Sequence, residues 1–476
     1  MEVQGRDKEI ALMGQLLESD RSEFLALYGR RRVGKTYLID QLYGNKMVFA
    51  MSGLHDATLP EQLQNFSQAF QSSTKQITPT PKNWLEAFHI LIQHIEKIKR
   101  PSKKVVFIDE LPWLSTARSG FLSSIEHFWN SWASKRKDIL LVVCGSAASW
   151  MIQNIVRNKG GLHNRITQTI RLLPFTLGET EKLLKSNGIK LSQYQIAQIY
   201  MVTGGIPYYL MSVKRGQSVP QIINNLCFNK DALLAKEFDF LFESLFGNGQ
   251  NHLAIINALA EKNIGLTRTE ILKKGKLPNA GSTTRLLDEL EESGFIGKYT
   301  PFEKKSKDAL YRIADPYTLF YYKFIKSTKS TSNTYLSISQ TSSWPIWQGM
   351  AFENICLYHI PQIKDKLGIS GVNTLQASWI KKGTKLDQGA QIDMLIDRDD
   401  AIINVCEAKF SQDVFVIEKD YAKKLQTKLS VFKQNIKSKK SVFLVFISTV
   451  GVQKNEYYFD LVQNEVKLTD LFADAK

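Results

Sequence analysis

The sequence predicts an α/β fold with a parallel sheet in its first part, a helical middle and a second α/β unit at its C-terminal end. Short apolar runs alternate with helically spaced apolar residues over roughly the first 170 residues, which favours parallel strands joined by crossover helices. The spacing is helical throughout residues 175–245. Strand-like runs return near 391–397, 402–408 and 441–448, around an amphipathic helix near 415–436.

Length and composition limit the class of protein. At roughly 150 residues per domain, 476 residues correspond to about three domains, and 43% apolar with 23% charged residues is typical of globular chains. The cysteines show no CxxC spacing, which excludes a disulfide scaffold and a thiolate zinc site. We expect a cytoplasmic protein with no membrane partner, because no apolar run reaches the roughly 18 residues of a membrane helix and no secretory signal is recognisable.

The net charge of +16 raises the expectation of a polyanionic partner such as DNA. Residues 1–225 hold 28 Lys and Arg against 17 Asp and Glu, a balance of +11, whereas the remaining residues hold 34 against 29, a balance of +5. Basic clusters cover residues 97–104, 135–137 and 437–440, and each can equally be a solvated face. The charge alone therefore supports a nucleic-acid partner only weakly.

The first α/β unit is predicted element by element from its apolar pattern. Phe24–Tyr28 is a strand-like run, and a helix follows from about Lys35 to Tyr43. Residues 83–98 place their apolar side chains at helical spacing. Val105–Ile108 and Ile139–Cys144 are continuous apolar runs, as buried parallel strands usually are.

A glycine-rich loop follows the first predicted strand and fits the pattern GxxxxGK[ST]. Its residues are Gly29, Arg30, Arg31, Arg32, Val33, Gly34, Lys35 and Thr36. The glycines let backbone N–H groups surround phosphate oxygens, Lys35 reaches the β and γ phosphates, and Thr36 offers a hydroxyl to Mg²⁺. The loop opens a helix, whose N-terminal dipole favours an anion and which adds Tyr37 to the ATP-binding residues.

Two carboxylates end the strand at Val105–Ile108. Asp109 can hold Mg²⁺ through water, and Glu110 can orient and deprotonate the attacking water. Two carboxylates at a strand end would be unremarkable in isolation, but the phosphate loop upstream favours the catalytic interpretation. The sequence therefore predicts an ATPase that uses Mg²⁺.

Residues 1–245 resemble AAA+-related ATPases, and more narrowly a prokaryotic group near the signal-transduction ATPases that is often fused to a C-terminal nuclease-like domain. The resemblance rests on the phosphate loop, on Asp109–Glu110 and on the polar strand end that contains Ser146. The opening segment resembles the GRExEL motif that lies near adenine, so it implies nucleotide contacts for Gly5 and Arg6.

Three residues take their roles from this resemblance alone. Ser146 matches the sensor of the γ phosphate, Arg165 in the segment 160–165 matches an arginine finger, and Pro207 matches the glycine–proline turn of a helical lid. Each has a simpler alternative: a cap at the strand end, a surface arginine, and a proline in the first turn of a helix. An arginine finger acts on a neighbour's nucleotide, so it implies a homo-oligomer.

The pattern over 250–315 predicts a winged helix with three helices and two short strands. Thr267 and Glu270 form a capping-box pattern for the second helix, and Gly294 ends the third. The third helix is acidic, so phosphates would repel it from the DNA major groove. Both DNA contact through the wing and a purely structural connector remain open. Residues 331–343 are rich in Ser and Thr and predict a linker or long loop.

Acidic and basic side chains recur on the predicted strands of the last unit. Asp393 lies on one strand and Glu407 and Lys409 on the next, where period-2 spacing puts the last two on one face. The strands form a hairpin, so Asp393 and Glu407 could share Mg²⁺ or Mn²⁺, with Lys409 stabilising phosphoryl charge and Glu353 completing the cluster from the preceding helix.

This order of residues resembles the PD-(D/E)XK nuclease superfamily, with Gln391 where Glu is common. The resemblance implies a restriction-endonuclease-like fold and a metal-dependent nuclease. The domains expected are an ATPase core (1–175), a helical lid (176–245), a winged helix (246–330), a linker (331–343) and a nuclease-like domain (344–476).

The sequence therefore predicts an ATP-hydrolysing protein that acts on nucleic acid. The alternative is a regulatory switch whose C-terminal domain is an inactive nuclease fold that binds a partner. A defence protein that acts through a nuclease is a third hypothesis, compatible with the motifs.

Overall fold

The structure is a computed structural model that describes residues 3–100, 102–116, 118–156, 164–246, 249–261, 265–328, 334–383 and 389–474. The chain divides into two compact units, Met1–Pro174 and Phe175–Lys476. The first unit ends one residue before the predicted end of the ATPase core. The predicted lid, winged helix, linker and nuclease-like domain all fall in the second unit, and their separate boundaries stay predictions.

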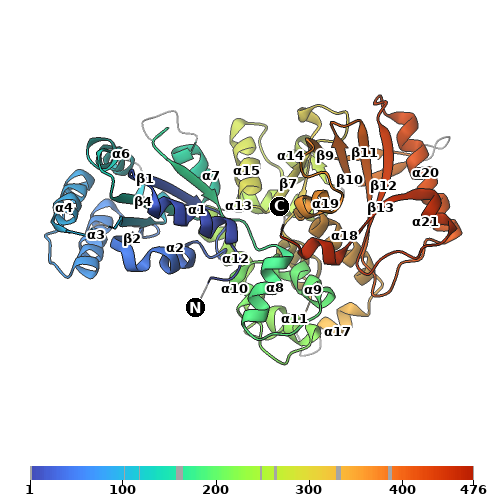
Figure 1. Cartoon of the computed structure of the whole chain (residues 1–476), viewed down its shortest axis with the longest axis horizontal. Helices are drawn as coiled ribbons and strands as arrows, with labels where there is room; N and C mark the ends of the chain where they lie inside the picture. The colour runs from blue at the N-terminus through green and yellow to red at the C-terminus, as the bar shows by residue number, and fades with distance from the viewer. Residues whose placement is uncertain are drawn as a thin grey trace. The chain divides into compact units, whose positions relative to one another are not determined.

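The first unit is built on a five-stranded sheet in which every pairing is parallel (Figure 1). The strand order is β2-β3-β4-β1-β5. The strands are β1 (Glu23–Tyr28), β2 (Met47–Ser52), β3 (Lys104–Asp109), β4 (Ile139–Gly145) and β5 (Gln168–Arg171). All residues of β1, β3 and β4 are buried, which explains their continuous apolar runs. The three strands predicted in this unit are confirmed.

Helices α3, α4 and α6 form one layer against this sheet (Figure 1). Phe24, Phe66, Trp84, Phe121 and Phe128 are fully or almost fully buried in the core between them. The predicted helices at 35–43 and 83–98 are confirmed. The helices of the unit are α1 (Asp7–Glu18), α2 (Lys35–Tyr43), α3 (Leu59–Thr74), α4 (Trp84–Lys97), α5 (Leu111–Leu114), α6 (Phe121–Ser131) and α7 (Ala148–Met151).

The basic cluster at residues 97–104 is a solvated face only in part. Lys103 and Lys104 are only 5% and 3% exposed, at the start of β3. The ammonium of Lys104 pairs with Asp138, and that of Lys103 donates to the backbone carbonyls of Arg21 and Lys137. Both ammonium groups are buried and paired within the fold, so they do not contribute to a polyanion-binding surface.

The second unit begins with helices, as predicted for residues 175–245. Capping boxes begin α8, α9 and α11. The helices of this region are α8 (Leu177–Ser186), α9 (Gln193–Thr203), α10 (Pro207–Leu210), α11 (Val219–Cys227) and α12 (Leu233–Phe246).

Three helices and a small antiparallel sheet follow, with strand order β6-β8-β7. The capping box of Thr267 and Glu270 is confirmed, and Gly294, at φ +77°, follows the cap of α15. These elements are α13 (Gln250–Ala260), β6 (Leu266–Thr267), α14 (Arg268–Gly275), α15 (Gly281–Glu292), β7 (Ile296–Tyr299), β8 (Leu310–Ile313) and α16 (Pro316–Phe320). The winged-helix assignment stays a prediction.

The prediction of a loop over 331–343 is wrong for residues 334–339, whereas residues 340–342 do form a turn. Residues Thr334–Ser339 form helix α17, and α18 (Ser343–Tyr358) begins at the predicted end of the linker. Tyr335 and Ile338 are buried, and α17 packs on α11. Burial of these two apolar side chains outweighs the Ser and Thr content on which the prediction depended.

The last sheet has the order β13-β12-β11-β10-β9 and mixes antiparallel with parallel pairings. Helix α20 (Lys419–Asn435) packs on β10, and α18 packs on β11 (Figure 1). The strands are β9 (Thr374–Lys381), β10 (Ala390–Arg398), β11 (Ile402–Lys409), β12 (Ser441–Ser448) and β13 (Val462–Lys467), with α19 (Ile360–Lys366) and α21 (Glu456–Leu461) beside them. The predicted hairpin of β10 and β11 is confirmed. In the part of the chain that the structure describes, no helix is both long and apolar enough to span a membrane.

A buried histidine ties the helical region to α18. His359 is 1% exposed; its Nε2 accepts the backbone N–H of Leu177 at 3.0 Å, and its Nδ1 lies 2.7 Å from the carbonyl of Ile355. Leu177 is the first residue of α8, whose N–H has no acceptor within its own helix. Burial lowers the pKa of His359 to about 4, although its hydrogen bond to Ile355 acts in the opposite direction.

We predict that His359→Phe destabilises the second unit by about 1–3 kcal/mol, because the buried N–H of Leu177 loses its acceptor. Unfolding by urea at neutral pH measures this cost.

The same histidine gives a pH dependence. The unfolded chain binds the His359 proton more tightly, so the stability that neutral His359 contributes is complete above pH 6.5 and is lost as pH falls toward 4. His359→Phe should therefore flatten the stability profile over that interval. An unchanged slope in the variant contradicts the assignment.

Candidate functional sites

The phosphate loop connects β1 to α2 in the first unit. Gly34 caps α2 with φ +90°, and Gly29 has φ +153°. A Cβ on Gly29 would lie 2.2 Å from the carbonyl oxygen of Leu172, so only glycine fits where the end of β5 approaches the loop. The structure thus explains both glycines of the motif by backbone geometry.

Lys35 is poised inside this loop. Its side chain is buried, and its ammonium donates to the carbonyls of Gly29 and Arg30 at 3.0 Å each. These hydrogen bonds hold the ammonium within the loop, at the N-terminus of α2, where anions are favoured. Arg30 and Val33 are also buried, Arg31 and Arg32 are half-buried, and Tyr37 is 47% exposed.

The residues predicted to hold Mg²⁺ lie together. The hydroxyl of Thr36 donates to Asp109 Oδ2 at 2.7 Å, and the backbone N–H of Glu110 donates to Asp109 Oδ1 at 2.8 Å. A hydroxyl and a carboxylate are the hard oxygen ligands that Mg²⁺ takes beside nucleotide phosphates. Thr36 and Asp109 therefore fit the ion.

Glu110 is held directly beside them. Its Oε2 accepts the hydroxyl of Ser146 at 2.8 Å and the backbone N–H of Ser146 at 3.1 Å. Ser146 follows β4, the strand between β1 and β3. Glu110 also has φ 45°, an uncommon conformation for a residue with a side chain. The sequence did not predict the contact between Ser146 and Glu110, because the family resemblance assigned Ser146 only as a sensor of the γ phosphate.

The opening segment contacts the phosphate loop through Arg6. Gly5 and Arg6 are buried, and the guanidinium of Arg6 donates to the carbonyls of Val33 and Leu173 at 3.3 and 2.6 Å. Arg6 therefore positions the phosphate loop, whatever its distance from a nucleotide base.

Arg165 and Pro207 receive less support. Arg165 is exposed in a turn before β5, and the rest of its predicted motif (160–163) lies outside the described residues. Pro207 is at the start of α10 in the second unit, after Gly204 and Gly205 at positive φ, as a first-turn proline would be. Their roles toward ATP stay predictions.

The second candidate site lies in the last sheet and on α18. Burial raises the pKa of Glu353 well above its ordinary value, and the nearby charges of Asp393 and Glu407 raise it further, while Arg312 and Lys409 oppose the shift. Four predicted residues, on α18, β10 and β11, are therefore electrostatic neighbours.

Glu407 is occupied by cations rather than open to solvent. Lys428 donates to its Oε2 at 2.7 Å, Lys409 lies 3.1 Å from its Oε1, and the hydroxyl of Tyr421 donates to Oε1 at 2.6 Å. Burial alone would raise the pKa of Glu407, but the two lysines lower it overall. Sequence reasoning missed the contacts of Lys428 and Tyr421, both on α20, which depend on how that helix lies on the sheet.

Asp393 lies where β10 departs from regular pairing with β9, between Ile392 and Leu395. Its Oδ1 accepts the side-chain amide of Gln391 at 2.6 Å. Among the described residues, no group of three or more His, Cys, Asp or Glu side chains is arranged to hold a metal ion. The predicted Mg²⁺ or Mn²⁺ shared by Asp393 and Glu407 is thus not supported, because lysines occupy Glu407.

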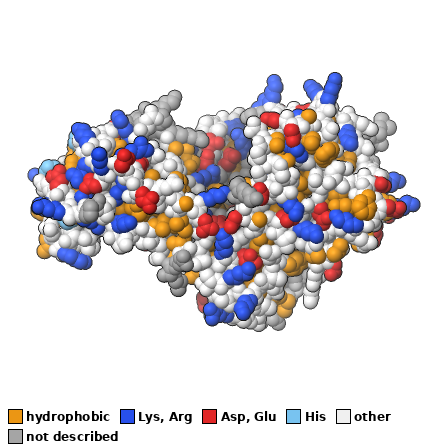
Figure 2. Space-filling view, in the orientation of Figure 1, with side chains coloured by type: hydrophobic (Ala, Val, Ile, Leu, Met, Phe, Trp, Pro, Cys, Tyr) orange, Lys and Arg blue, Asp and Glu red, His pale blue; other side chains and the backbone are white. Residues whose placement is uncertain are grey.

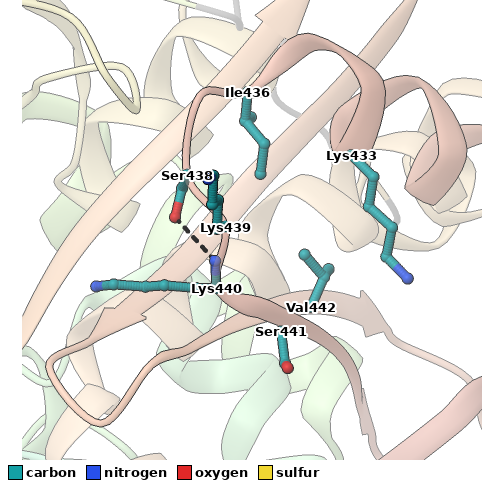
Figure 3. Close-up of a pocket in the computed structure, with 7 residues that line it drawn as sticks. All are labelled: Lys433, Ile436, Ser438, Lys439, Lys440, Ser441 and Val442. Atoms are coloured by element: carbon teal, nitrogen blue, oxygen red, sulfur yellow. Dashed lines mark hydrogen bonds between the residues drawn. The ribbon is translucent and has the colours of Figure 1, made fainter.

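A third feature is the basic cluster at the end of α20. Lys433, Lys439 and Lys440 line an open cavity of about 450 Å³ between this helix and β12 (Figure 3). The ammonium of Lys440 lies 2.6 Å from Asp397 Oδ1. The side chains of Lys433 and Lys439 are exposed to solvent. On the face that Figure 2 shows, lysine and arginine alternate with acidic side chains and form no continuous basic surface.

The solved structures to which this chain is similar include two of low overall likeness. The Walker-type ATPase PABY2304 of Pyrococcus abyssi is 18% identical with a TM-score of 0.47, and the match covers 67% of this chain and 96% of that one. The ORC2 protein of Aeropyrum pernix is 13% identical with a TM-score of 0.40, covering 68% and 94%. Neither likeness carries an argument about activity.

Comparison of sequences is more informative. Over 408 residues the chain is 25% identical to the uncharacterized protein MJECL04 of Methanocaldococcus jannaschii, which covers 83% of this chain and 84% of that protein. Residues 4–213 match the family model described as an ATPase domain predominantly from Archaea. That match includes the phosphate loop, Asp109 and Glu110, so the chain carries a P-loop ATPase domain.

Proposed function

We propose that the first unit hydrolyses ATP with Mg²⁺. The observation that carries this proposal is the contact of Thr36 with Asp109, beside a Glu110 that Ser146 holds in place. A glycine-rich turn with a solvated lysine would need no buried carboxylate at its hydroxyl. The match of residues 4–213 to an ATPase domain supports the same conclusion.

The residues divide the work by position. Backbone N–H groups of the loop and the ammonium of Lys35 bind the phosphates, while Thr36 and Asp109 hold Mg²⁺, which offsets charge on the β and γ phosphates. Glu110 accepts a proton from the attacking water. Its Oε2 is bound by Ser146, so the other oxygen, Oε1, is the one available to that water.

We further propose that the second unit acts on nucleic acid through the residues around Glu353 and Asp393. The mixed sheet between α18 and α20 and the neighbouring Glu353, Asp393, Glu407 and Lys409 support a nuclease-like fold. Cleavage then requires a cation to displace the lysines from Glu407. The pairing of Glu407 with Lys409 and Lys428 equally favours the alternative, an inactive fold that binds a partner under the control of the ATPase.

Lys35→Ala should weaken ATP binding roughly tenfold to a hundredfold, because it removes a charge-assisted hydrogen-bond donor to phosphate. Titration with a fluorescent ATP analogue measures this. Lys82→Ala, which removes an exposed lysine of the same unit, should bind as the wild type does.

Glu110→Gln should keep ATP affinity but lower kcat by about 10²–10⁴, because the amide cannot accept the proton of water. Phosphate release under saturating ATP measures turnover, with the exposed Glu18→Gln as the matched control. Wild-type turnover in Glu110→Gln would refute the assignment.

The nuclease proposal predicts that the chain cleaves DNA or RNA in Mg²⁺ or Mn²⁺, and that Asp393→Asn abolishes this while Asp399→Asn, at an exposed turn of the same hairpin, does not. Gel analysis of labelled strands, with and without ATP, decides it. If the wild type cleaves neither substrate, the nuclease proposal is refuted.

A further inference from the structure

A cavity of about 450 Å³ lies beside the carboxylates of the second unit. Its polar lining includes Glu353, Asp393 and Lys409, which were predicted from sequence, and Arg312, which was not. Arg312 belongs to β8, in the small sheet that precedes the predicted nuclease-like domain. A smaller neighbouring cavity is lined by Arg312, Gln391 and Asp393 as well.

The small sheet is firmly attached to the last sheet at this point. The backbone N–H of Phe302 donates to the carbonyl of Ser378 on β9 at 2.7 Å, and Phe302 packs on Phe432 of α20. Glu303 accepts the backbone N–H groups of Lys437 and Ser438 at 2.8–2.9 Å. The strand pair that carries Arg312 is therefore attached to the C-terminal sheet. These contacts hold Arg312 at the cavity.

The guanidinium of Arg312 is held in orientation but lacks acceptors. Its Cζ lies 4.3 Å from the centre of the Tyr299 ring, a cation–π contact. Its Nε and Nη2 are buried and have no hydrogen-bond partner among the described residues. Leaving a charged donor buried and unpaired is costly, so this site is built to receive an acceptor.

Two of the three neighbouring ionisable side chains are already engaged. Asp393 Oδ1 accepts from Gln391, and Lys409 is paired with Glu407. Glu353 interacts with Arg312 only electrostatically. The rest of the lining is largely apolar and includes Met350 and Ile346, which is 71% exposed. The cavity thus offers an unpaired guanidinium beside an apolar wall.

We propose that Arg312 is a binding residue whose Nε and Nη2 donate to the two non-bridging oxygens of a phosphodiester in a nucleic-acid strand. A planar guanidinium matches two phosphate oxygens, and the apolar wall suits the sugar and base attached to them. The inference rests on the proposed action of the second unit on nucleic acid, and it adds that the site is incomplete without β8.

Binding in EDTA tests this separately from cleavage, because metal-dependent hydrolysis cannot occur. The probe is a fluorescein-labelled single strand of about twelve nucleotides, mixed with the full chain and followed by anisotropy, a length that matches the roughly 4–16 nucleotides of common single-strand sites. Arg312→Gln should weaken binding at least about tenfold, the usual effect of losing a charge-assisted hydrogen bond. Lys190→Gln, which removes one exposed charge elsewhere in the same unit, should stay within about twofold.

Arg312→Lys keeps the charge but loses the planar fork, so it should fall between the wild type and Arg312→Gln. The unfolding temperature of every variant should be no lower than that of the wild type, and ATP turnover should be unchanged, which excludes misfolding as the cause. Equal oligonucleotide affinity in Arg312→Gln and the wild type overturns the inference, as does a wild type that does not bind.

Competition identifies the ligand. Unlabelled oligonucleotide should displace the probe, whereas inorganic phosphate at the same phosphate concentration should not; equal displacement by phosphate assigns the site to a free anion and overturns the proposal. Binding that depends on Arg312 without any cleavage in Mg²⁺ or Mn²⁺ supports the inference and refutes only the nuclease. Cleavage with the same kcat/KM in Arg312→Gln does the reverse.

Discussion

The placement of β4 between β1 and β3 determines where chemistry can occur in the first unit. Because all five strands are parallel, the carboxyl ends of neighbouring strands meet at one edge of the sheet. Thr36, after β1, reaches Asp109, at the end of β3, across the width of β4. Ser146 follows the end of β4 and binds Glu110, the residue after Asp109. The strand order thus brings the phosphate loop, both carboxylates and Ser146 to one edge of the sheet.

The parts of this site that depend on local sequence were predictable. The phosphate loop follows from the conformations that its glycines adopt, and β1, β3 and β4 follow from uninterrupted burial. Strands β2 and β5 were missed because both are edge strands with partly exposed residues. The burial of Lys104 was equally out of reach, since its partner Asp138 lies on a different segment, beside the next strand.

The second site shows a sharper division between local and long-range information. Period-2 spacing correctly placed Glu407 and Lys409 on one face, where they form an ion pair. The spacing contains nothing about Lys428, Tyr421 or Arg312, which arrive from α20 and β8. Their positions depend on how a helix and a small sheet pack on the strands, so the sequence predicted the acidic residues and Lys409 but not the further cations, Lys428 and Arg312.

Those cations give two neighbouring carboxylates opposite properties. Glu407 carries two lysines that lower its pKa against the effect of burial, whereas burial and the charge of Asp393 raise the pKa of Glu353 against the weaker electrostatic effect of Arg312 and Lys409. Near neutral pH, Glu407 is therefore ionised, whereas Glu353, with a pKa of about 7, still holds a proton in part of the molecules. Helix α20 contributes to this difference, because it places Lys428 and Tyr421 on Glu407. The charge of the site therefore depends on how α20 packs on the sheet as well as on the acidic residues themselves.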